Sequence, residues 1–145
     1  MIRKISNKDN VSIAVYLSKK LNLSLSDANI KANKIIKSGL PAFILEGKDI
    51  QGICWVENRL IDNKKEKFVE ILVNHWRLAE SYIQILRWNL NGDYFLLIPK
   101  YDTLNRTYNK NGIRFLKVEG QNNLYVARFE KRNFYSFKSE DVDGK

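Results

Sequence analysis

With 145 residues, 44% of them hydrophobic, the chain is long enough to bury a core and too apolar for a disordered protein. Its formal net charge of +9 favours polyanionic partners such as nucleic acid, although a lysine-rich composition is also typical of proteins translated from AT-rich genes. A single cysteine argues against a disulfide framework, and with a single histidine it argues against a zinc site. No segment approaches the roughly 20 apolar residues that span a membrane. We therefore expect a cytoplasmic protein without a metal or a membrane partner.

The first half of the chain predicts a strand, two helices and a strand hairpin. The second helix has the clearest signals, because Ser24 supplies a capping oxygen with Asp27 three residues on, while Gly39 and Pro41 end the helix. A turn at 47–49 separates two further apolar segments. The predicted elements are a strand at 2–6, a helix at 11–20, a helix between Ser24 and Gly39, and strands at 42–46 and 51–58.

The second half alternates strands with helices. A polar run at 62–67 predicts a turn. From Phe68 to Val73 the following strand is apolar on both faces except for Glu70, as in strands covered on both sides. The remaining predicted elements are this strand at 66–73, a helix at about 78–91, a strand at 93–98, a short helix ending at Gly112, and strands at 113–118 and 124–129. We therefore expect a single α/β domain over residues 1–135, with a mixed sheet of about seven strands flanked by about four helices, and a flexible tail at 136–145.

The order of these elements, together with one short motif, resembles the GNAT acyl-CoA N-acyltransferases. The motif is Tyr108-Asn109-Lys110-Asn111-Gly112-Ile113, which is similar to the family's Tyr-x-Lys-x-Gly-Phe with Ile113 in place of phenylalanine. The resemblance covers nearly the entire chain. It implies a sheet whose fourth and fifth strands splay apart to receive acetyl-CoA.

The bend after the predicted central strand departs from the family pattern. Family members carry Gln/Arg-x-x-Gly-x-Gly/Ala there, and glycine leaves the backbone N–H groups open to a diphosphate. With Arg77 aligned to the first position, Glu80 and Tyr82 stand where the two small residues belong, so a carboxylate and a ring oppose the diphosphate. This degenerate motif predicts weak or lost acyl transfer. The residues that the resemblance implies for cofactor binding are Val73, Asn74, Arg77, Leu78 and Ala79.

Two residues are candidates for catalysis. Glu70 lies on the central strand, where desolvation can raise its pKa toward neutrality and suit it as a general base, unless it pairs with a lysine or arginine. In the family the tyrosine of the short motif donates a proton to the departing thiolate, which the resemblance implies for Tyr108; its alternative role is packing on one face of a helix. Glu57 and His75 are weaker candidates for proton transfer.

A non-catalytic role is the rival hypothesis. Basic and aromatic side chains alternate at 131–138, and this segment could dock against a partner subunit in a larger assembly, such as a bacteriophage particle. The expected location would then be the virion. The same pattern could stack bases and neutralise phosphates, so nucleic-acid binding is a third hypothesis.

Overall fold

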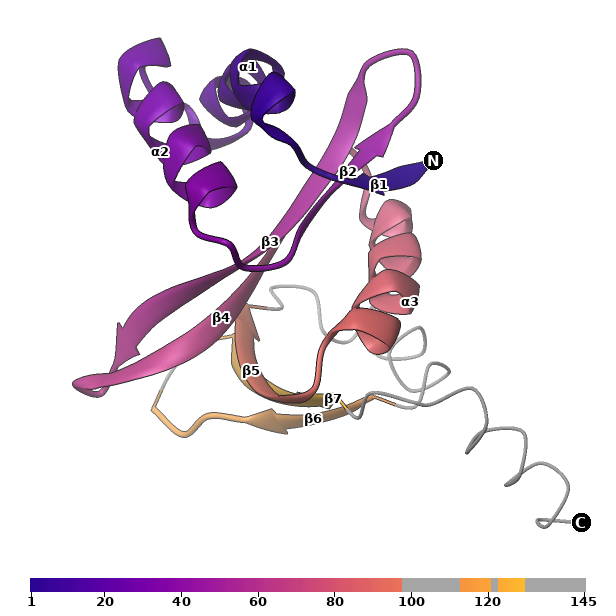
Figure 1. The fold of residues 1–145 in the computed structure, drawn as a ribbon. Coiled ribbons are helices and arrows are strands. Elements are labelled where there is room, and N and C mark those ends of the chain that lie inside the picture. The colour runs from indigo at the N-terminus through magenta and orange to yellow at the C-terminus, as the bar shows by residue number, and fades with distance from the viewer. Residues whose placement is uncertain (98–112, 121–122, 130–145) are drawn as a thin grey trace, which may run out of the picture.

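The chain folds into a seven-stranded sheet covered by helices on both faces (Figure 1). The computed structural model describes residues 1–97, 113–120 and 123–129. In chain order the elements are β1 (Ile2–Lys4), α1 (Asn10–Leu21), α2 (Leu25–Lys37), β2 (Ala42–Glu46), β3 (Ile50–Ile61), β4 (Lys64–Val73), α3 (Ala79–Asn89), β5 (Gly92–Leu97), β6 (Arg114–Lys117) and β7 (Leu124–Phe129), with short 3-10 turns at Asn7–Asp9 and Trp76–Leu78.

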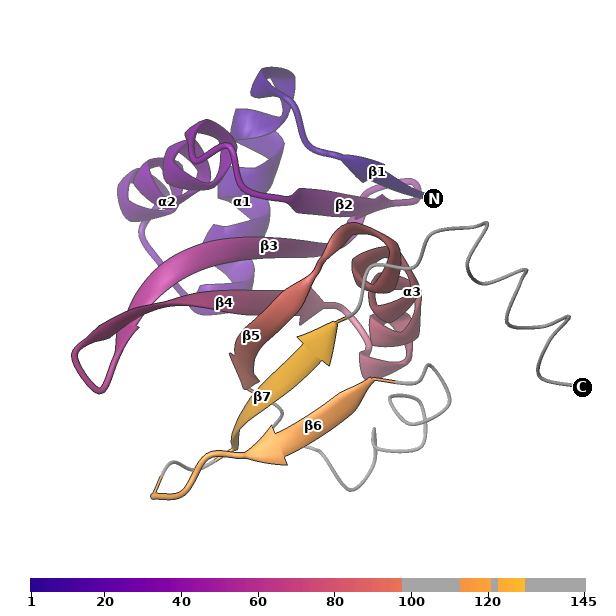
Figure 2. The same cartoon turned by 60° about the horizontal axis from the view of Figure 1, so that its bottom comes forward.

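The strand order in the sheet is β1-β2-β3-β4-β5-β7-β6. Every neighbouring pair is antiparallel except β4 and β5, which are parallel because α3 connects them (Figure 2). The mixed α/β sheet of seven strands is confirmed. The described residues contain three α-helices, and the predicted fourth helix, which ends at Gly112, lies outside them.

Two apolar cores lie on opposite faces of the sheet. Along β3, Ile53 and Trp55 point to the core under α1 and α2, whereas Cys54 and Val56 point to the core under α3. This alternation follows from the two-residue period of a strand. Cys54 is fully buried, as expected of a small apolar residue in the middle of a sheet.

Local sequence signals explain where α2 begins and where α1 and α2 end. The Ser24 hydroxyl accepts a hydrogen bond from the backbone N–H of Asp27, which confirms the predicted cap of α2. Gly39 lies just beyond α2 with a φ of +74°, a conformation that glycine adopts without strain. At the end of α1, Asn22 takes the left-handed conformation and its N–H bonds to the carbonyl of Ser18.

The predicted turn at 62–67 is present but shorter than expected. The turn consists of Asp62 and Asn63, with φ of 51° and 65°, and β4 begins at Lys64. Asp and Asn tolerate the left-handed conformation that a two-residue hairpin turn requires, so these two residues suffice to reverse the chain. Lys64 and its neighbours belong to the exposed tip of the hairpin, where polar residues on both faces of a strand imitate a loop.

Smaller differences concern element ends. The first strand stops at Lys4 rather than at residue 6, because Ser6 begins the 3-10 turn Asn7–Asp9. The third helix starts at Ala79 and ends at Asn89, and the following strand runs over Gly92–Leu97.

Candidate functional site

The sheet is nearly interrupted between β4 and β5. These strands share one register pair, Phe68 with Phe95, whereas β3 and β4 share ten, from Gly52 with Val73 to Ile61 with Lys64. In Figure 1, β5 turns away from β4. The β4 edge at 69–73 therefore has no β5 partner among the described residues.

Glu70 lies two residues beyond the Phe68–Phe95 pair, on the face covered by α1 and α2. It stands opposite Trp55 in the register of β3 and β4. Its side chain is only 21% exposed. Glu70, the candidate general base, therefore lies where the two strands part.

Arg59 links two carboxylates on this face. Its Nη2 donates to Glu70 Oε2 over 3.0 Å, and its Nε donates to Glu57 Oε2 over 2.5 Å. The guanidinium carbon lies 3.9 Å from the centre of the Phe68 ring, which fixes its orientation. Trp55 Nε1 also donates to Glu57. The pairing with a cation, the predicted alternative for Glu70, is thus present.

Arg59 does not bring the pKa of Glu70 back to its ordinary value. Burial raises this pKa, and the nearby charge of Glu57 adds to the rise, while Arg59 and Lys31 oppose it. For Glu57, burial alone would raise the pKa, but the hydrogen bonds from Arg59 and Trp55 hold it below the ordinary value. Two carboxylates whose pKa values are pushed apart are typical of an acid–base site, and Glu70 is the one suited to accept a proton.

The predicted cofactor residues lie in and beside the bend after β4, where three backbone amides donate within the protein. The N–H of Asn74 donates to the Gln51 carbonyl over 2.9 Å. The N–H of Leu78 donates to the carbonyl of His75 over 2.9 Å, and that of Arg77 donates to the Nδ1 of His75 over 3.2 Å.

Of the remaining two cofactor residues, Val73 is paired with Gly52 in the sheet, and Ala79 is the buried first residue of α3. The five residues share one bend, and their role in cofactor binding stays a prediction.

Tyr82 belongs to the core rather than to the bend. It is fully buried and packs with Leu86 and Leu90 in the core under α3. A Cβ added to Gly52 would lie 3.1 Å from the Tyr82 ring, so the ring contacts the bare backbone of β3. The Tyr82 ring therefore lies in the core under α3, although the alignment to the family motif predicted that it would oppose the diphosphate.

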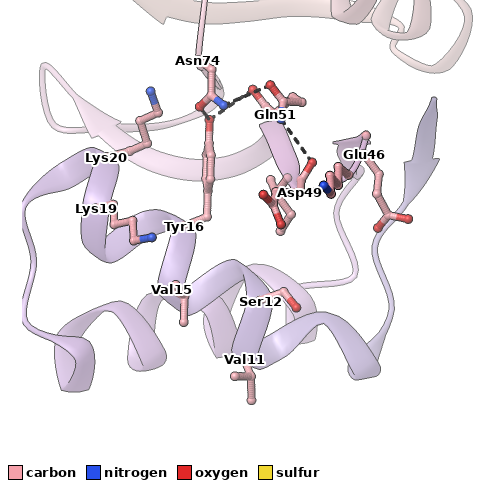
Figure 3. Close-up of a pocket in the computed structure, with 13 residues that line it drawn as sticks. Val11, Ser12, Val15, Tyr16, Lys19, Lys20, Glu46, Asp49, Gln51 and Asn74 are labelled. Carbon is pink, nitrogen blue, oxygen red and sulfur yellow. Dashed lines mark hydrogen bonds between the residues drawn. The ribbon is translucent and has the colours of Figure 1, made fainter.

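A cleft that the sequence did not reveal lies beside this bend, between α1 and the β2–β3 hairpin (Figure 3). Its volume is about 730 Å³. At one end the Tyr16 hydroxyl donates to Asn74 Oδ1 over 2.9 Å, and Asn74 Nδ2 donates to Gln51 Oε1 over 3.2 Å. Burial raises the pKa of Tyr16 to about 12, so the hydroxyl stays protonated to higher pH than that of an ordinary tyrosine. Helical spacing places Tyr16 on the buried face of α1, but no sequence pattern predicts that this face meets the β4–α3 bend.

The remaining predictions concern segments outside the described residues, membrane-spanning helices and metal sites. Tyr108 and the segment at 131–138 lie outside, as does the predicted tail at 136–145. In the described part of the chain, no helix is long and apolar enough to cross a membrane, and no three His, Cys, Asp or Glu side chains gather as metal ligands.

The solved structures that resemble this chain include acetyltransferases. A GNAT-family acetyltransferase from Bacillus cereus superposes with a TM-score of 0.63 at 18% identity, over 92% of this chain and 98% of that one. A putative acetyltransferase from Salmonella typhimurium, solved with its cofactor acetyl-CoA, gives 0.59 at 13% identity, over 92% and 94%. A putative phosphinothricin N-acetyltransferase gives 0.55 at 14% identity, over 92% and 99%.

No protein-family model matches the sequence, and no curated protein matches it. At these identities the structural likeness shows the fold. The chain has the GNAT fold, as its element order indicated.

Proposed function

We propose that the protein transfers an acetyl group from acetyl-CoA to a primary amine, and that it binds acetyl-CoA weakly. The observation that carries the proposal is the place of Glu70, a mostly buried carboxylate with a raised pKa immediately beyond the last pair between two parting strands. The acetyltransferases of the same fold support the reaction class. One of them was solved with acetyl-CoA.

The β4 backbone fits an acyl-CoA better than the bend does. Along 69–73, the β4 edge has no β5 partner among the described residues and would offer N–H and C=O groups to the amides of a pantetheine arm. In the bend, the amides of Asn74, Arg77 and Leu78 already donate within the protein, so a diphosphate meets fewer donors. Weak binding of the cofactor follows from this difference.

Each residue would then have a defined task. Bound acetyl-CoA would supply the activated thioester. Glu70 would accept a proton from the amine, directly or through water, so that the nitrogen lone pair can form the new C–N bond as the C–S bond breaks. Arg59 would keep the Glu70 carboxylate in one orientation, and Tyr108 would protonate the departing sulfur.

Glu70→Gln tests the proposal. This variant should lose at least about a hundredfold in the rate of thiol release from acetyl-CoA with a panel of primary amines, because a general base contributes on that order. The matched control is Glu66→Gln, which removes a carboxylate from the same strand and face on the other side of the Phe68–Phe95 pair. Equal rates in the two variants would contradict the assignment of Glu70.

The internal hydrogen bonds of the bend favour a second candidate function, a protein that keeps the fold without catalysis and acts as a binding module. Calorimetry separates the two. Heat on titration of acetyl-CoA supports the enzyme, whereas no heat at millimolar ligand together with no thiol release supports the module.

A further inference from the structure

We propose that the cleft between α1 and the β2–β3 hairpin binds a phosphate-bearing small molecule. This inference goes beyond the proposed acyl transfer and requires neither Glu70 nor catalysis. The cleft has a volume of about 730 Å³, within the range of roughly 300–1,000 Å³ that is typical of small-molecule sites. This volume suits a ligand of mononucleotide size.

The charges around the cleft favour an anion. Lys19 and Lys20 enter its lining from the last turn of α1, and Lys48 enters it from the hairpin turn. None of the three has a carboxylate within ion-pair distance among the residues that the structure describes. Of the two acidic residues in the lining, Glu46 is bound to Arg3 at 2.7 Å, which leaves Asp49 as the carboxylate without an ion pair in the described part.

The polar end of the cleft is held in place. The hydroxyl of Tyr16 bonds to Asn74 Oδ1, and the amide of Asn74 bonds to Gln51, so α1, β3 and the end of β4 are joined (Figure 3). Lys20 lies 5.9 Å from the centre of the Tyr16 ring. A cleft whose walls are fixed relative to one another loses less conformational entropy on binding a ligand.

An apolar wall accompanies the cations. Val11 and Val15 are 71% and 40% exposed, and both line the cleft from α1 (Figure 3). Exposed valines beside lysines suit a ligand that joins a phosphate group to a flat or apolar group. ADP has this combination, and pyrophosphate has the charge alone.

Two sources could supply such a ligand. Asn74 begins the bend that is predicted to meet the diphosphate of CoA, so the cleft lies next to that position and could hold phosphates of CoA itself. A separate phosphate ester would instead bind beside an occupied or empty CoA site. The chemistry is the same in both cases.

Calorimetry with ADP, pyrophosphate and CoA tests the inference. The double variant Lys19→Gln/Lys48→Gln should weaken ADP and pyrophosphate binding by about tenfold or more for each lysine that contacts phosphate. Lys34→Gln/Lys37→Gln is the matched control, because it removes the same charge from the last turn of α2, outside the cleft. Thermal melts check that both variants fold. Val11→Ser should weaken ADP binding and leave pyrophosphate binding unchanged.

The outcomes divide as follows. If CoA displaces ADP from the wild-type protein, the cleft holds phosphates of CoA; if both bind at once, it holds a separate ligand. Either result supports the inference when only the cleft variant weakens binding. Absence of binding by all three probes, or equal weakening in the cleft variant and the control, would overturn it. Loss of acyl transfer in Glu70→Gln with ADP binding intact would keep the two proposals distinct.

Discussion

Arg59 and Glu70 form a part-buried pair in which Nη2 lies 3.0 Å from Oε2, at the point where β4 and β5 part. The guanidinium favours the charged carboxylate, and burial favours the protonated one. Burial has the larger effect, so the pKa of Glu70 is raised even with its partner in place.

Arg59→Gln should therefore raise the pKa of Glu70 further. Loss of the attractive charge leaves burial and the charge of Glu57 less opposed, so the acid limb of the kcat/KM profile should move to higher pH. The measurement is kcat/KM for acetyl-CoA-dependent transfer against pH. Arg128→Gln removes an exposed arginine paired with Asp93 and should leave the profile in place. A shift of the limb to lower pH would contradict the prediction.

Asp9→Asn should destabilise the fold by about 1–3 kcal/mol, the usual cost of removing one partner of a buried polar group. Asp9 accepts from Arg3 at 2.7 and 2.9 Å and from the N–H of Ser6 at 2.8 Å, and it connects β1 to the start of α1. The measurement is urea unfolding at neutral pH.

The same carboxylate predicts an acid-sensitive contribution to stability. The hydrogen bond from Arg3 is the main cause that lowers the pKa of Asp9 below its ordinary 3.8. A lowered folded-state pKa means that the stabilisation is complete above the unfolded-state value and is lost as pH falls through the folded-state value. The wild-type and Asp9→Asn curves of unfolding free energy against pH should therefore converge below about pH 3.8. A constant separation down to strong acid would refute this.

Gly52→Ala should cost about 1–3 kcal/mol, as overpacking in a filled core does. The added Cβ would lie 2.9 Å from Val73 Cγ1, 3.0 Å from the Leu72 carbonyl oxygen and 3.1 Å from the Tyr82 ring. Gly47→Ala is the control, because the nearest atom there is 3.6 Å away, an ordinary contact. Thermal melting of both variants measures the difference, and equal melting temperatures would show that β3 can shift to admit a methyl group.

Tyr16→Phe should lower the unfolding free energy by about 1 kcal/mol, the net worth of a typical hydrogen bond. It removes the donor to Asn74 Oδ1 and so releases the start of the β4–α3 bend from α1. We expect faster amide exchange at Asn74 in the variant, measured by hydrogen–deuterium exchange. Unchanged exchange would mean that the backbone bond from Asn74 to Gln51 holds the bend without help from α1.

Local patterns predicted the fold where the signal depends only on neighbouring residues. Ser24 marks the start of α2 and Gly39 follows its end, as expected, because a capping oxygen and a left-handed glycine act within a few residues of chain. The position of Glu70 could also be predicted, since it is the one charged residue in the otherwise apolar stretch from Phe68 to Val73. In contrast, the polar tip of the β3–β4 hairpin reads as a loop, because a strand exposed on both faces has no apolar alternation to reveal it.

The site was harder to predict from the sequence than the fold, because its decisive contacts join residues far apart in the chain. Tyr16 and Asn74 are 58 residues apart, and the partnership of Arg59 with Glu70 depends on the register of two strands. The acceptors to which the backbone N–H groups of the bend donate likewise cannot be predicted from the sequence. Whether the N–H of Asn74 donates to Gln51 or to a ligand is decided by how the start of β3 lies beside the end of β4.

The core under α3 has a consequence for ligand entry. It contains Val69 from β4, Leu96 from β5 and Phe129 from β7, so side chains hold the two parts of the sheet together where backbone bonds between β4 and β5 are few. A molecule that lies along the β4 edge would complete hydrogen bonds that β5 leaves unmade in the described part of the chain, instead of breaking ones already formed. Admission would then require no local unfolding, and the arrival rate of such a molecule should not depend on the stability of the protein.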